Sequence, residues 1–420
     1  MSKIVINGGK RLFGEVEIHG AKNSVLPLLA ATVLCRGTSI IHNCPQLSDV
    51  NASINILRHL GCDCYFNNNT VTVNSNTIEC CQIPDSLMLK MRSSVIFLGA
   101  ILGRCGNAVI SSPGGCELGP RPIDLHISAL KRLGAKVTES HGLIEFNVQK
   151  GLRGARIYLS FASVGATENI ILAATTAKGV TVIHNAAKEP EICDLAAFLN
   201  ACGACIYGAG TDTVTIYGVE NIKCCTHTVI PDRIAAASYM AAAAVTGSEI
   251  TLKNVMPEHL TAINSVFEEA GCKIKCNDTS LTIKAPQRLS RVSTVRTAIY
   301  PGFPTDAGPL VLAMLSKSYG TSVIVENIFE NRFRYVDELK RLGANIKVEG
   351  RVAIIEGVST LSAATCKCTD LRGGAALVVA ALASEGITAI GDIHHIKRGY
   401  EGIVSRLSLL GADIKEVKGK

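Results

Sequence analysis

Apolar residues follow one pattern six times along the chain. Each time, an alanine- and leucine-rich stretch with helical periodicity leads to a glycine, a β-branched run, a second helix-like stretch with one apolar face, and another glycine. Two strand-like arms complete the unit. The glycine after the second stretch recurs at intervals of about 70 residues, so each unit is about one sixth of the chain. These glycines are Gly61, Gly134, Gly203, Gly271, Gly343 and Gly411.

A second series of glycines divides the chain in the same way. Each one follows the first helix-like stretch of its unit and precedes a β-branched run. Glycine suits the left-handed position after a helix, which a residue with a Cβ atom resists, so both series mark helix ends. The second series is Gly37, Gly106, Gly179, Gly247, Gly320 and Gly386, and the strands predicted after it cover residues 38–43, 108–112, 180–185, 249–254, 321–327 and 387–392.

The sixth unit ends after one strand-like arm, whereas the first five have two. Residues 3–7, with the sequence KIVIN, stand before the first unit and can supply the missing arm. This arrangement predicts an α/β fold with two pseudo-symmetric domains of three units each. The first domain would cover residues 22–230, and the second would cover 231–420 completed by 1–21.

With this division the chain crosses between the domains twice, near Gly20-Ala21-Lys22 and near Pro231-Asp232. Two such crossings would form a hinge, which is where a ligand held by both domains would bind. A solenoid of six stacked units is the alternative. It is weakened because each unit is about twice as long as common helical repeats.

Composition and charge indicate a folded protein with small anionic ligands. Apolar residues make up 47% of the chain and charged residues 18%, unlike a disordered chain. The formal net charge is +7, but the basic residues are dispersed, which argues against a nucleic-acid partner. The longest apolar stretches, such as 234–245, are too short to span a membrane, and residues 1–22 lack the apolar centre of a signal peptide. We therefore expect a cytoplasmic protein with no membrane partner.

The chain has 17 cysteines, several of them close together in the sequence. Zinc binding is one interpretation. However, the single CxxC motif, Cys202 to Cys205, has no second CxxC or HxxxH motif at a finger-like distance. Most cysteine pairs, such as Cys62 and Cys64, fall where a strand is expected to begin, and there cysteine serves as a small buried hydrophobe. We expect reduced, structural thiols and no metal.

The largest departure from the repeat is a loop in the second unit. Residues 111–122, SSPGGCELGPRP, contain three prolines and three glycines. Such a loop can adopt backbone conformations closed to other residues and can move as a lid. Cys116 lies at its middle and Arg121 five positions later, and a mobile, exposed thiol near a cation is typical of a reactive cysteine. An idle loop cysteine is the alternative.

No familiar nucleotide-binding motif is present. The chain has no GxxxxGK[ST] sequence, and GAGTDT at 208–213 is not a GxGxxG loop between a strand and a helix. Phosphate binding would then rely on basic side chains and helix N-termini. The alternative for each of these basic residues is a solvated position on the surface. This alternative is weakest for Arg398, because Arg398 lies at a strand-to-helix transition. The candidates are Lys22, Arg92, Arg121, Arg372 and Arg398.

Two acidic residues precede apolar helix-like stretches. Asp306 lies between Pro304 and Pro309, and Asp370 opens the sequence TDLRGGAA. Both positions fit helix N-capping. A capping carboxylate that faces a cleft could also serve as a general base.

Nine short motifs occur in order over the whole length of the chain. They are GAKN at 20–23, PGGC at 113–116 with RPIDLH at 121–126, SVGAT at 163–167, EPEI at 189–192, PDRI at 231–234, FPTD at 303–306, ENRF at 330–333, TDLR at 369–372 and RGYE at 398–401. Together they resemble the UDP-N-acetylglucosamine 1-carboxyvinyltransferase family, the enolpyruvyl transferases that open peptidoglycan precursor synthesis. The resemblance implies two inside-out α/β barrel domains, with helices inside and the N-terminal strand in the second domain.

The resemblance also implies a reaction. The enolpyruvyl group of phosphoenolpyruvate would pass to the 3′-hydroxyl of UDP-N-acetylglucosamine, with release of phosphate through a tetrahedral ketal. Cys116 would be the general acid, and also the thiol that the epoxide antibiotic fosfomycin alkylates, and Asp306 would be the base. Asp370 and Arg372 would support the reaction centre, and no metal, organic cofactor or oligomer is required.

The same resemblance implies which residues bind the two substrates. Lys22, Arg121 and Arg398 would hold phosphoenolpyruvate. The sugar-nucleotide site would be lined by Asn23, Arg92, Arg121, Pro122, Ile123, Asp124, Leu125, Ser163, Val164, Gly165, Asp306 and Ile328.

One position departs from the family pattern. The family often carries a lysine just upstream of SVGAT, where this chain has Phe161. Two other functions compete with the one implied. The sister enolpyruvyl transferase, which acts on shikimate 3-phosphate, would show the same repeats, but the PGGC loop argues against it. A non-catalytic repeat protein that binds sugar nucleotides is disfavoured because Cys116, Lys22, Asp306 and Arg398 are all present.

Overall fold

The computed structural model describes residues 2–88, 91–111 and 123–418, which form two compact units. The chain passes between the units after His19 and after Ile230. We call the part from Gly20 to Ile230 the first unit and the remainder the second unit. The earlier border falls two residues before the predicted one, because the Ala21 N–H donates to the Ile230 carbonyl at 2.7 Å, inside the first unit.

The first unit contains three copies of the predicted pattern, each with an apolar helix, a strand, a second helix and a β-hairpin. The first copy consists of α1 (Lys22–Ala31), β3 (Thr38–His42), α2 (Ser48–His59), β4 (Asp63–Asn67) and β5 (Thr70–Asn74). The second consists of α3 (Asp85–Met88), η1 (Arg92–Ile96), α4 (Phe97–Cys105), β6 (Asn107–Ser111), α5 (Asp124–Arg132), β7 (Lys136–Ser140) and β8 (Leu143–Asn147). The third consists of β9 (Arg156–Tyr158), α6 (Val164–Ala174), β10 (Val180–His184), α7 (Pro190–Ala201), β11 (Cys205–Tyr207) and β12 (Thr213–Tyr217), and β13 (Thr226–Thr228) follows.

The second unit repeats the pattern three more times after the strands β1 (Lys3–Asn7) and β2 (Glu15–Glu17). Its first copy consists of α8 (Arg233–Val245), β14 (Glu249–Lys253), η2 (Pro257–Leu260), α9 (Thr261–Glu269), β15 (Lys273–Asn277) and β16 (Ser280–Lys284). The next consists of β17 (Thr294–Arg296), η3 (Thr305–Ala307), α10 (Gly308–Leu315), β18 (Thr321–Val325), η4 (Arg332–Tyr335), α11 (Val336–Arg341), β19 (Asn345–Glu349), β20 (Val352–Glu356) and β21 (Leu361–Ser362). The last consists of β22 (Thr365–Lys367), α12 (Leu371–Leu382), β23 (Ser384–Glu385), β24 (Ile387–Gly391), η5 (Ile396–Arg398), α13 (Ile403–Leu409) and β25 (Asp413–Val417).

The predicted missing arm of the last hairpin is confirmed. Strand β1 lies between β24 and β25 and pairs antiparallel with both, with Ile4 opposite Ile390 and Ile6 opposite Ile414. In five of the sheets a hairpin arm pairs with the strand after the apolar helix, and one further strand adds in parallel, as β2 does to β14. The N-terminal segment therefore completes a sheet whose other strands come from the C-terminal end of the chain.

The twelve predicted glycines all adopt positive φ angles, between +62° and +126°. At such φ values a residue with a Cβ atom is strained, so these positions favour glycine. The helix-end role is confirmed for the glycines after the second helix of each copy, which directly follow the C-cap residue, and for Gly106 and Gly247. It is wrong for Gly37, Gly179, Gly320 and Gly386, which lie three to five residues beyond the C-cap residue, next to the following strand. GAGTDT at 208–213 joins β11 to β12 and does not lead into a helix.

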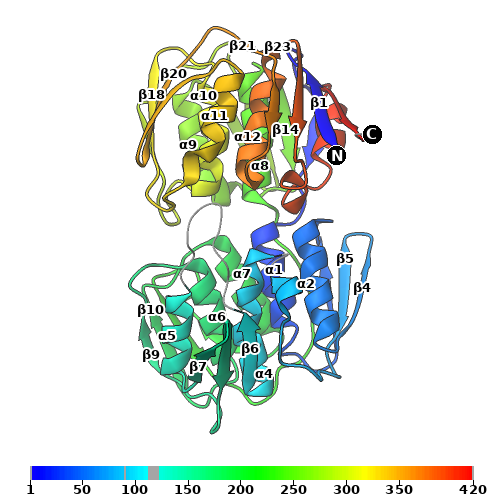
Figure 1. Cartoon of the computed structure of the whole chain (residues 1–420), viewed down its shortest axis with the longest axis vertical. Coiled ribbons are helices and arrows are strands. Elements are labelled where there is room, and N and C mark those ends of the chain that lie inside the picture. The colour runs from blue at the N-terminus through cyan, green and yellow to red at the C-terminus, as the bar shows by residue number, and fades with distance from the viewer. Residues whose placement is uncertain (1, 89–90, 112–122, 419–420) are drawn as a thin grey trace. The chain divides into compact units, whose positions relative to one another are not determined.

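Helices form the centre of each unit. In the second unit α8, α10 and α12 pack against one another, and Figure 1 shows β18 and β20 on one side of α10 to α12 and β1 on the other. In the first unit α4 packs against α6 and α1. A helix that is apolar on all sides needs such enclosure, which explains the alanine-rich sequence of α8. Among the described residues, no helix is both long and apolar enough to cross a bilayer.

Candidate functional site

The carboxylate of Asp306 binds two buried arginines of the second unit. Asp306 lies in η3, directly before α10. Its Oδ1 accepts a hydrogen bond from Arg332 Nη2 at 2.8 Å, and its Oδ2 accepts from Arg372 Nε at 3.1 Å. Neither oxygen caps a helix, so the capping interpretation of Asp306 is wrong. The side chain of Asp306 is 27% exposed, whereas the side chains of the two arginines that it binds are nearly fully buried.

Asp370, with a similar sequence context, does cap its helix. Its Oδ1 accepts from the backbone N–H groups of Arg372 and Gly373 at 3.0 and 2.9 Å. The capping interpretation is therefore confirmed for this residue, and the cap fixes the first turn of α12, which carries Arg372. Asp370 thus acts on Asp306 through the position of Arg372.

Arg372 connects Asp306 to the RGYE motif. Its Nη1 donates to the hydroxyl of Tyr400 at 3.2 Å, and that hydroxyl lies 2.8 Å from Ser238 Oγ. Burial is the largest single influence and opposes the guanidinium charge, but Asp306, Tyr400 and Asp232 together outweigh it, so the pKa of Arg372 lies above its usual value. Arg398 precedes Tyr400 by two residues, in η5, and its side chain is partly exposed.

Glu326, which no sequence motif marked, contacts the predicted residue Ile328 and the turn before α10. It is 1% exposed, and its Oε1 accepts from the backbone N–H of Ile328 at 2.8 Å. Its Oε2 accepts from Thr305 Oγ1 at 2.8 Å. One buried carboxylate therefore holds the backbone of Ile328 close to the turn that carries Asp306.

Lys22 opens α1 in the first unit, as predicted, and forms a buried ion pair. Its Nζ lies 2.8 Å from Asp49 Oδ2, and the two side chains are 9% and 1% exposed. Burial of an unpaired ammonium would be costly, and Asp49, at the start of α2, supplies the opposite charge. Asn23 follows it and is exposed. Nothing in the local sequence distinguishes Asp49 from an ordinary acidic residue at the start of a helix.

A short hydrogen-bonded chain anchors the start of α1. Ser24 Oγ donates to Asp194 Oδ2 on α7, and Asp194 Oδ1 lies 2.8 Å from His227 Nε2 on β13. Asp194 also accepts from the backbone N–H of Ile230 at 3.4 Å. The first turn of α1, with Lys22 and Asn23, is thus fastened to the end of the first unit.

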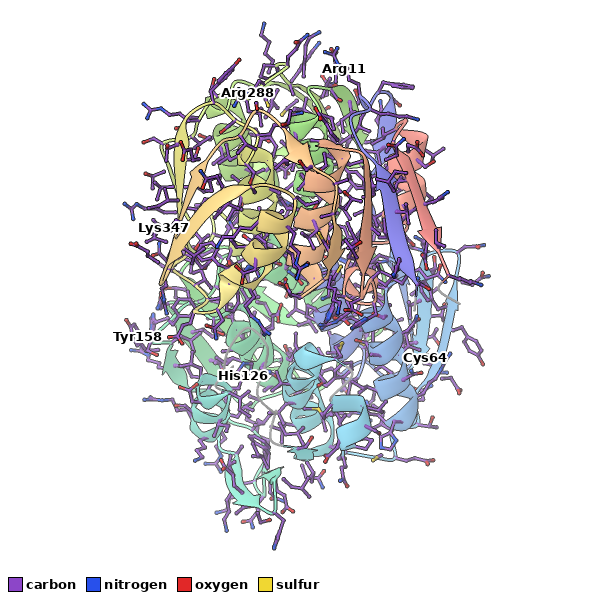
Figure 2. All side chains as sticks on the ribbon, turned by 45° about the horizontal axis from the view of Figure 1, so that its top comes forward. Arg11, Cys64, His126, Tyr158, Arg288 and Lys347 are labelled. Atoms are coloured by element: carbon purple, nitrogen blue, oxygen red, sulfur yellow. The ribbon has the colours of Figure 1, made fainter. Side chains whose placement is uncertain are left out.

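His126 and Asn169 join three of the predicted nucleotide-binding segments. Asn169 Nδ2 lies 2.7 Å from His126 Nδ1 and donates to the carbonyl of Val95, in η1, at 3.0 Å. A Cβ atom on Gly165 would lie 3.3 Å from the His126 ring. The starts of α5 and α6 and the segment that begins with Arg92 are therefore held together. Figure 2 shows His126 among the helices, whereas Tyr158 and Lys347 project outward.

The predicted residues around this junction occupy helix starts. Ser163 caps α6, with its Oγ accepting from the Ala166 N–H at 3.3 Å, and Val164 and Gly165 form the first turn. Ile123 immediately precedes α5, and Asp124 and Leu125 are its first residues. The N–H groups at such ends can bind phosphate oxygens. Phe161 is 47% exposed, two residues before the cap.

Three predicted residues, Cys116, Arg121 and Pro122, lie outside the described residues, as does the loop 111–122 apart from Ser111. Arg92 begins η1. No three histidine, cysteine, aspartate or glutamate side chains within residues 2–88, 91–111 and 123–418 are arranged to hold a metal ion.

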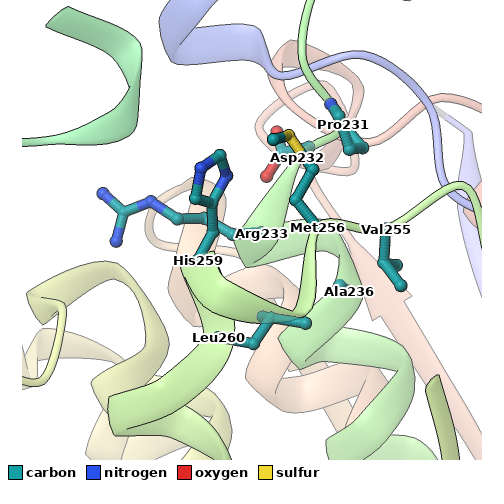
Figure 3. A pocket seen from close by; sticks show the side chains of 8 residues that line it. All are labelled: Pro231, Asp232, Arg233, Ala236, Val255, Met256, His259 and Leu260. Carbon is teal, nitrogen blue, oxygen red and sulfur yellow. The ribbon is translucent and has the colours of Figure 1, made fainter. Parts of the chain in front are cut away.

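A small hollow in the second unit lies between the start of α8 and η2. Figure 3 shows Arg233 and His259 on one side of it and Pro231 and Val255 on the other. The space within it for a water-sized sphere is about 0 Å³, whereas pockets for drug-sized ligands usually measure ~300–1,000 Å³. The hollow is therefore too small for a sugar nucleotide.

Sequence comparisons connect the whole chain with enolpyruvyl transferases. The family model described as EPSP synthase (3-phosphoshikimate 1-carboxyvinyltransferase) matches residues 6–407. UDP-N-acetylglucosamine 1-carboxyvinyltransferase 2 of Caldanaerobacter subterraneus subsp. tengcongensis is 50% identical over 417 residues, covering 99% of this chain and all of the relative. The protein of the same name from Clostridium acetobutylicum is 48% identical, with both chains fully covered.

Solved structures show the same fold at lower sequence identity. The enolpyruvyl transferase NikO from Streptomyces tendae has a TM-score of 0.90 and 24% identity, over all of this chain and 99% of that one. EPSP synthase from Acinetobacter baumannii has a TM-score of 0.76 and 18% identity, with both chains fully covered. These likenesses establish the α/β fold of enolpyruvyl transferases for this chain.

Proposed function

Because the chain belongs to the UDP-N-acetylglucosamine 1-carboxyvinyltransferase family, we propose that it transfers the enolpyruvyl group of phosphoenolpyruvate to the 3′-hydroxyl of UDP-N-acetylglucosamine, releasing phosphate. This reaction begins the synthesis of peptidoglycan precursors. The relatives at 48 to 50% identity support this acceptor. The matching family model is named after the enzyme that acts on shikimate 3-phosphate. It therefore supports enolpyruvyl transfer but does not identify the acceptor of the enolpyruvyl group.

The reaction proceeds by addition and elimination. A proton is added to the methylene carbon of phosphoenolpyruvate, and the sugar oxygen bonds to the neighbouring carbon to form a tetrahedral ketal. Loss of a methyl proton and cleavage of the bond to phosphate then restore the double bond. An acid, a base and fixed cations around the phosphate and carboxylate are needed.

We assign a role in this reaction to each predicted site residue. Cys116 is the general acid, and Asp306 is the base for the sugar hydroxyl. Lys22, Arg121 and Arg398 bind phosphoenolpyruvate, and Asp370 fixes Arg372 beside Asp306. The sugar nucleotide binds at Ile328 and at the predicted helix starts of the first unit. These helix starts carry Asn23, Arg92, Ile123, Asp124, Leu125, Ser163, Val164 and Gly165.

The observation that best supports a catalytic Asp306 is its pair of arginines. Arg332 and Arg372 are 4% and 3% exposed, and both direct guanidinium groups at one carboxylate. Burying two guanidinium groups beside one carboxylate costs the desolvation energy of two cations. A turn with only a structural role before a helix does not require this arrangement. It orients the carboxylate and leaves it partly exposed, as a base requires.

The finer architecture and the setting are part of the proposal. The helix-centred units, with sheets built around α8, α10 and α12, support two inside-out α/β barrel domains, residues 22–230 and 231–420 completed by 1–21. Both substrates are small soluble molecules, so we assign the enzyme to the cytoplasm, with no membrane partner and no required oligomer.

The acceptor is tested by phosphate release with phosphoenolpyruvate and either UDP-N-acetylglucosamine or shikimate 3-phosphate. We expect turnover with the sugar nucleotide and none above background with shikimate 3-phosphate. Mass spectrometry of the product should show the added enolpyruvyl group. Turnover with shikimate 3-phosphate alone would reject the proposed acceptor, and turnover with neither would reject the enzyme class.

A second prediction concerns Phe161, where the family often has lysine. Phe161→Lys should lower the KM for UDP-N-acetylglucosamine, because a charge-assisted contact is worth ~1.5–3 kcal/mol when well formed and less when solvated. The kcat and the KM for phosphoenolpyruvate should change little, since uniform binding does not alter the chemical step.

Steady-state kinetics at low and high salt check this prediction. Raised salt should remove part of the gain, because a lysine contact is screened. Tyr158→Lys, at an exposed aromatic residue of the same unit, is the matched control and should leave the nucleotide KM unchanged. An unchanged nucleotide KM for Phe161→Lys at low salt would place residue 161 outside the nucleotide site.

A further inference from the structure

Glu326 is a buried carboxylate that accepts four hydrogen bonds. It directly follows β18 and is 1% exposed. Its Oε1 accepts from Thr297 Oγ1 at 2.9 Å and from the backbone N–H groups of Ile328 and Phe329 at 2.8 and 3.1 Å. Its Oε2 accepts from Thr305 Oγ1 at 2.8 Å. All four donors are uncharged groups, and their hydrogen bonds offset the cost of burying the carboxylate.

The turn after Glu326 has a backbone that side chains hold in place. The Asn327 N–H donates to Thr297 Oγ1 at 2.8 Å, and Asn327 Nδ2 donates to the Thr297 carbonyl at 3.0 Å. The next two N–H groups, those of Ile328 and Phe329, donate to Glu326. Asn327 is exposed and Ile328 is half-buried. The turn is therefore fixed from its buried side, while its outer side remains exposed.

Glu326 also contacts the turn that carries Asp306. Thr305 directly precedes Asp306 in η3, and its hydroxyl donates to Glu326. Arg332 Nη2 donates both to the Thr305 carbonyl, at 3.1 Å, and to Asp306 Oδ1, at 2.8 Å. One carboxylate and one guanidinium group thus fix residues 305 and 306 together. A displacement of Thr305 would move the carboxylate of Asp306 as well.

We propose that Glu326 is a positioning residue of the transferase, which sets the distance between Ile328, where the sugar nucleotide binds, and Asp306, which accepts the proton of the 3′-hydroxyl. The inference rests on the proposed function and adds a residue to it. Because Glu326 is buried, it acts through Thr305 and the turn at 327–329, and not by touching the substrate. A displacement of ~1 Å between a bound substrate and a catalytic group can cost ~10²-fold in rate, so a fixed distance between the two segments matters for the reaction.

Thr305→Val tests the link between Glu326 and the base. Valine keeps the shape of threonine but has no hydroxyl, so Glu326 Oε2 loses its donor while Oε1 keeps its bonds to the turn at 327–329. We expect the kcat to fall by ~10–10²-fold. The Kd for UDP-N-acetylglucosamine should stay within about threefold of the wild-type value, because the nucleotide contact at Ile328 is retained. Thr305→Ser keeps the hydroxyl and should restore the kcat to within about threefold of the wild type.

Glu326→Ala removes both links at once. The kcat should fall at least as far as in Thr305→Val. The nucleotide should also bind about tenfold more weakly or worse, because the backbone at Ile328 is no longer held in its binding conformation before the ligand arrives. Thr294→Val, at an exposed threonine of β17 in the same unit, is the matched control and should change neither quantity.

Phosphate-release kinetics at saturating substrates and calorimetric titration with UDP-N-acetylglucosamine measure both quantities in the full-length protein. The calorimetric stoichiometry counts the molecules that can bind, so an unfolded fraction is not mistaken for a lower kcat. A wild-type kcat in Thr305→Val, or an equal loss of kcat in Thr305→Ser, would reject Glu326 as a positioning residue. A wild type that does not turn over the sugar nucleotide would reject the proposed function and this inference with it. If Glu326→Ala does not fold, the two Thr305 variants still decide.

Discussion

Replacing Cys116 with serine should reduce turnover by ~10²–10⁴-fold, the range that general acid catalysis contributes. A serine hydroxyl has a much higher pKa than a thiol, so it cannot match the thiol as a proton donor to the methylene carbon. Binding of UDP-N-acetylglucosamine should stay within about tenfold, because the loss concerns the chemical step. Phosphate release at saturating substrates, with nucleotide binding by calorimetry, measures both quantities.

Cys116→Asp is the matched variant, because a carboxylic acid can also deliver a proton, and it should retain activity. Fosfomycin should alkylate the wild type at Cys116 and spare the aspartate variant. Cys224 is the strongest competitor, since its pKa is about 6, whereas the exposed Cys193 and Cys276 have raised pKa values.

Cys224→Ser should therefore leave the rate of fosfomycin inactivation unchanged. Mass spectrometry locates the adduct in each protein. An adduct on any other of the 17 cysteines that accompanies inactivation would contradict the role of Cys116.

Asp306→Asn should depress the rate by ~10²–10⁴-fold while nucleotide binding changes by less than about tenfold. An amide cannot accept the sugar proton. It also offers one acceptor oxygen, whereas Arg332 and Arg372 each donate to a different oxygen of Asp306. One arginine then faces an NH₂ group, so the variant should also lose stability, by ~1–3 kcal/mol for an unsatisfied buried donor.

The turnover number and the free energy of unfolding of Asp306→Asn together show whether Asp306 acts as a base or only as a counter-ion of the arginines. If Asp306 only neutralises the arginines, stability falls and the turnover number stays near normal. Asp337→Asn is the matched control, because Asp337 is an 86% exposed carboxylate on α11 of the same unit, and it should change neither quantity. A turnover number for Asp306→Asn within tenfold of the wild type would reject the catalytic role.

Local sequence was sufficient for the architecture. Each glycine of the two series requires a backbone conformation that other residues resist, and the apolar period of each stretch selects helix or strand. The six repeats could therefore be read without any tertiary contact. The position of residues 3–7 followed from counting, since the last repeat lacked one hairpin arm, and β1 fills that place between β24 and β25.

The contacts of the candidate site could not be read in this way. Asp306 and Asp370 share one sequence signature, a carboxylate before an apolar helix, yet Asp370 caps its own helix while Asp306 binds Arg332 and Arg372, 26 and 66 residues later. Capping depends on backbone N–H groups within three residues, which the local sequence specifies. An ion pair between distant segments depends on how helices and sheets pack.

The same limit applies to the cysteines. The sequence showed Cys202 with Cys205 and Cys224 with Cys225, and it suggested a structural role for all four. In the folded chain Cys202 instead faces Cys35 and Cys225, 167 and 23 residues away. Neighbours in sequence share a local backbone, but the protonation of a thiol depends on which groups the fold brings against it. The fold and its repeats were thus encoded locally. The ion pairs of Asp306 with Arg332 and Arg372, and the contacts of Cys202 with Cys35 and Cys225, depend on long-range packing.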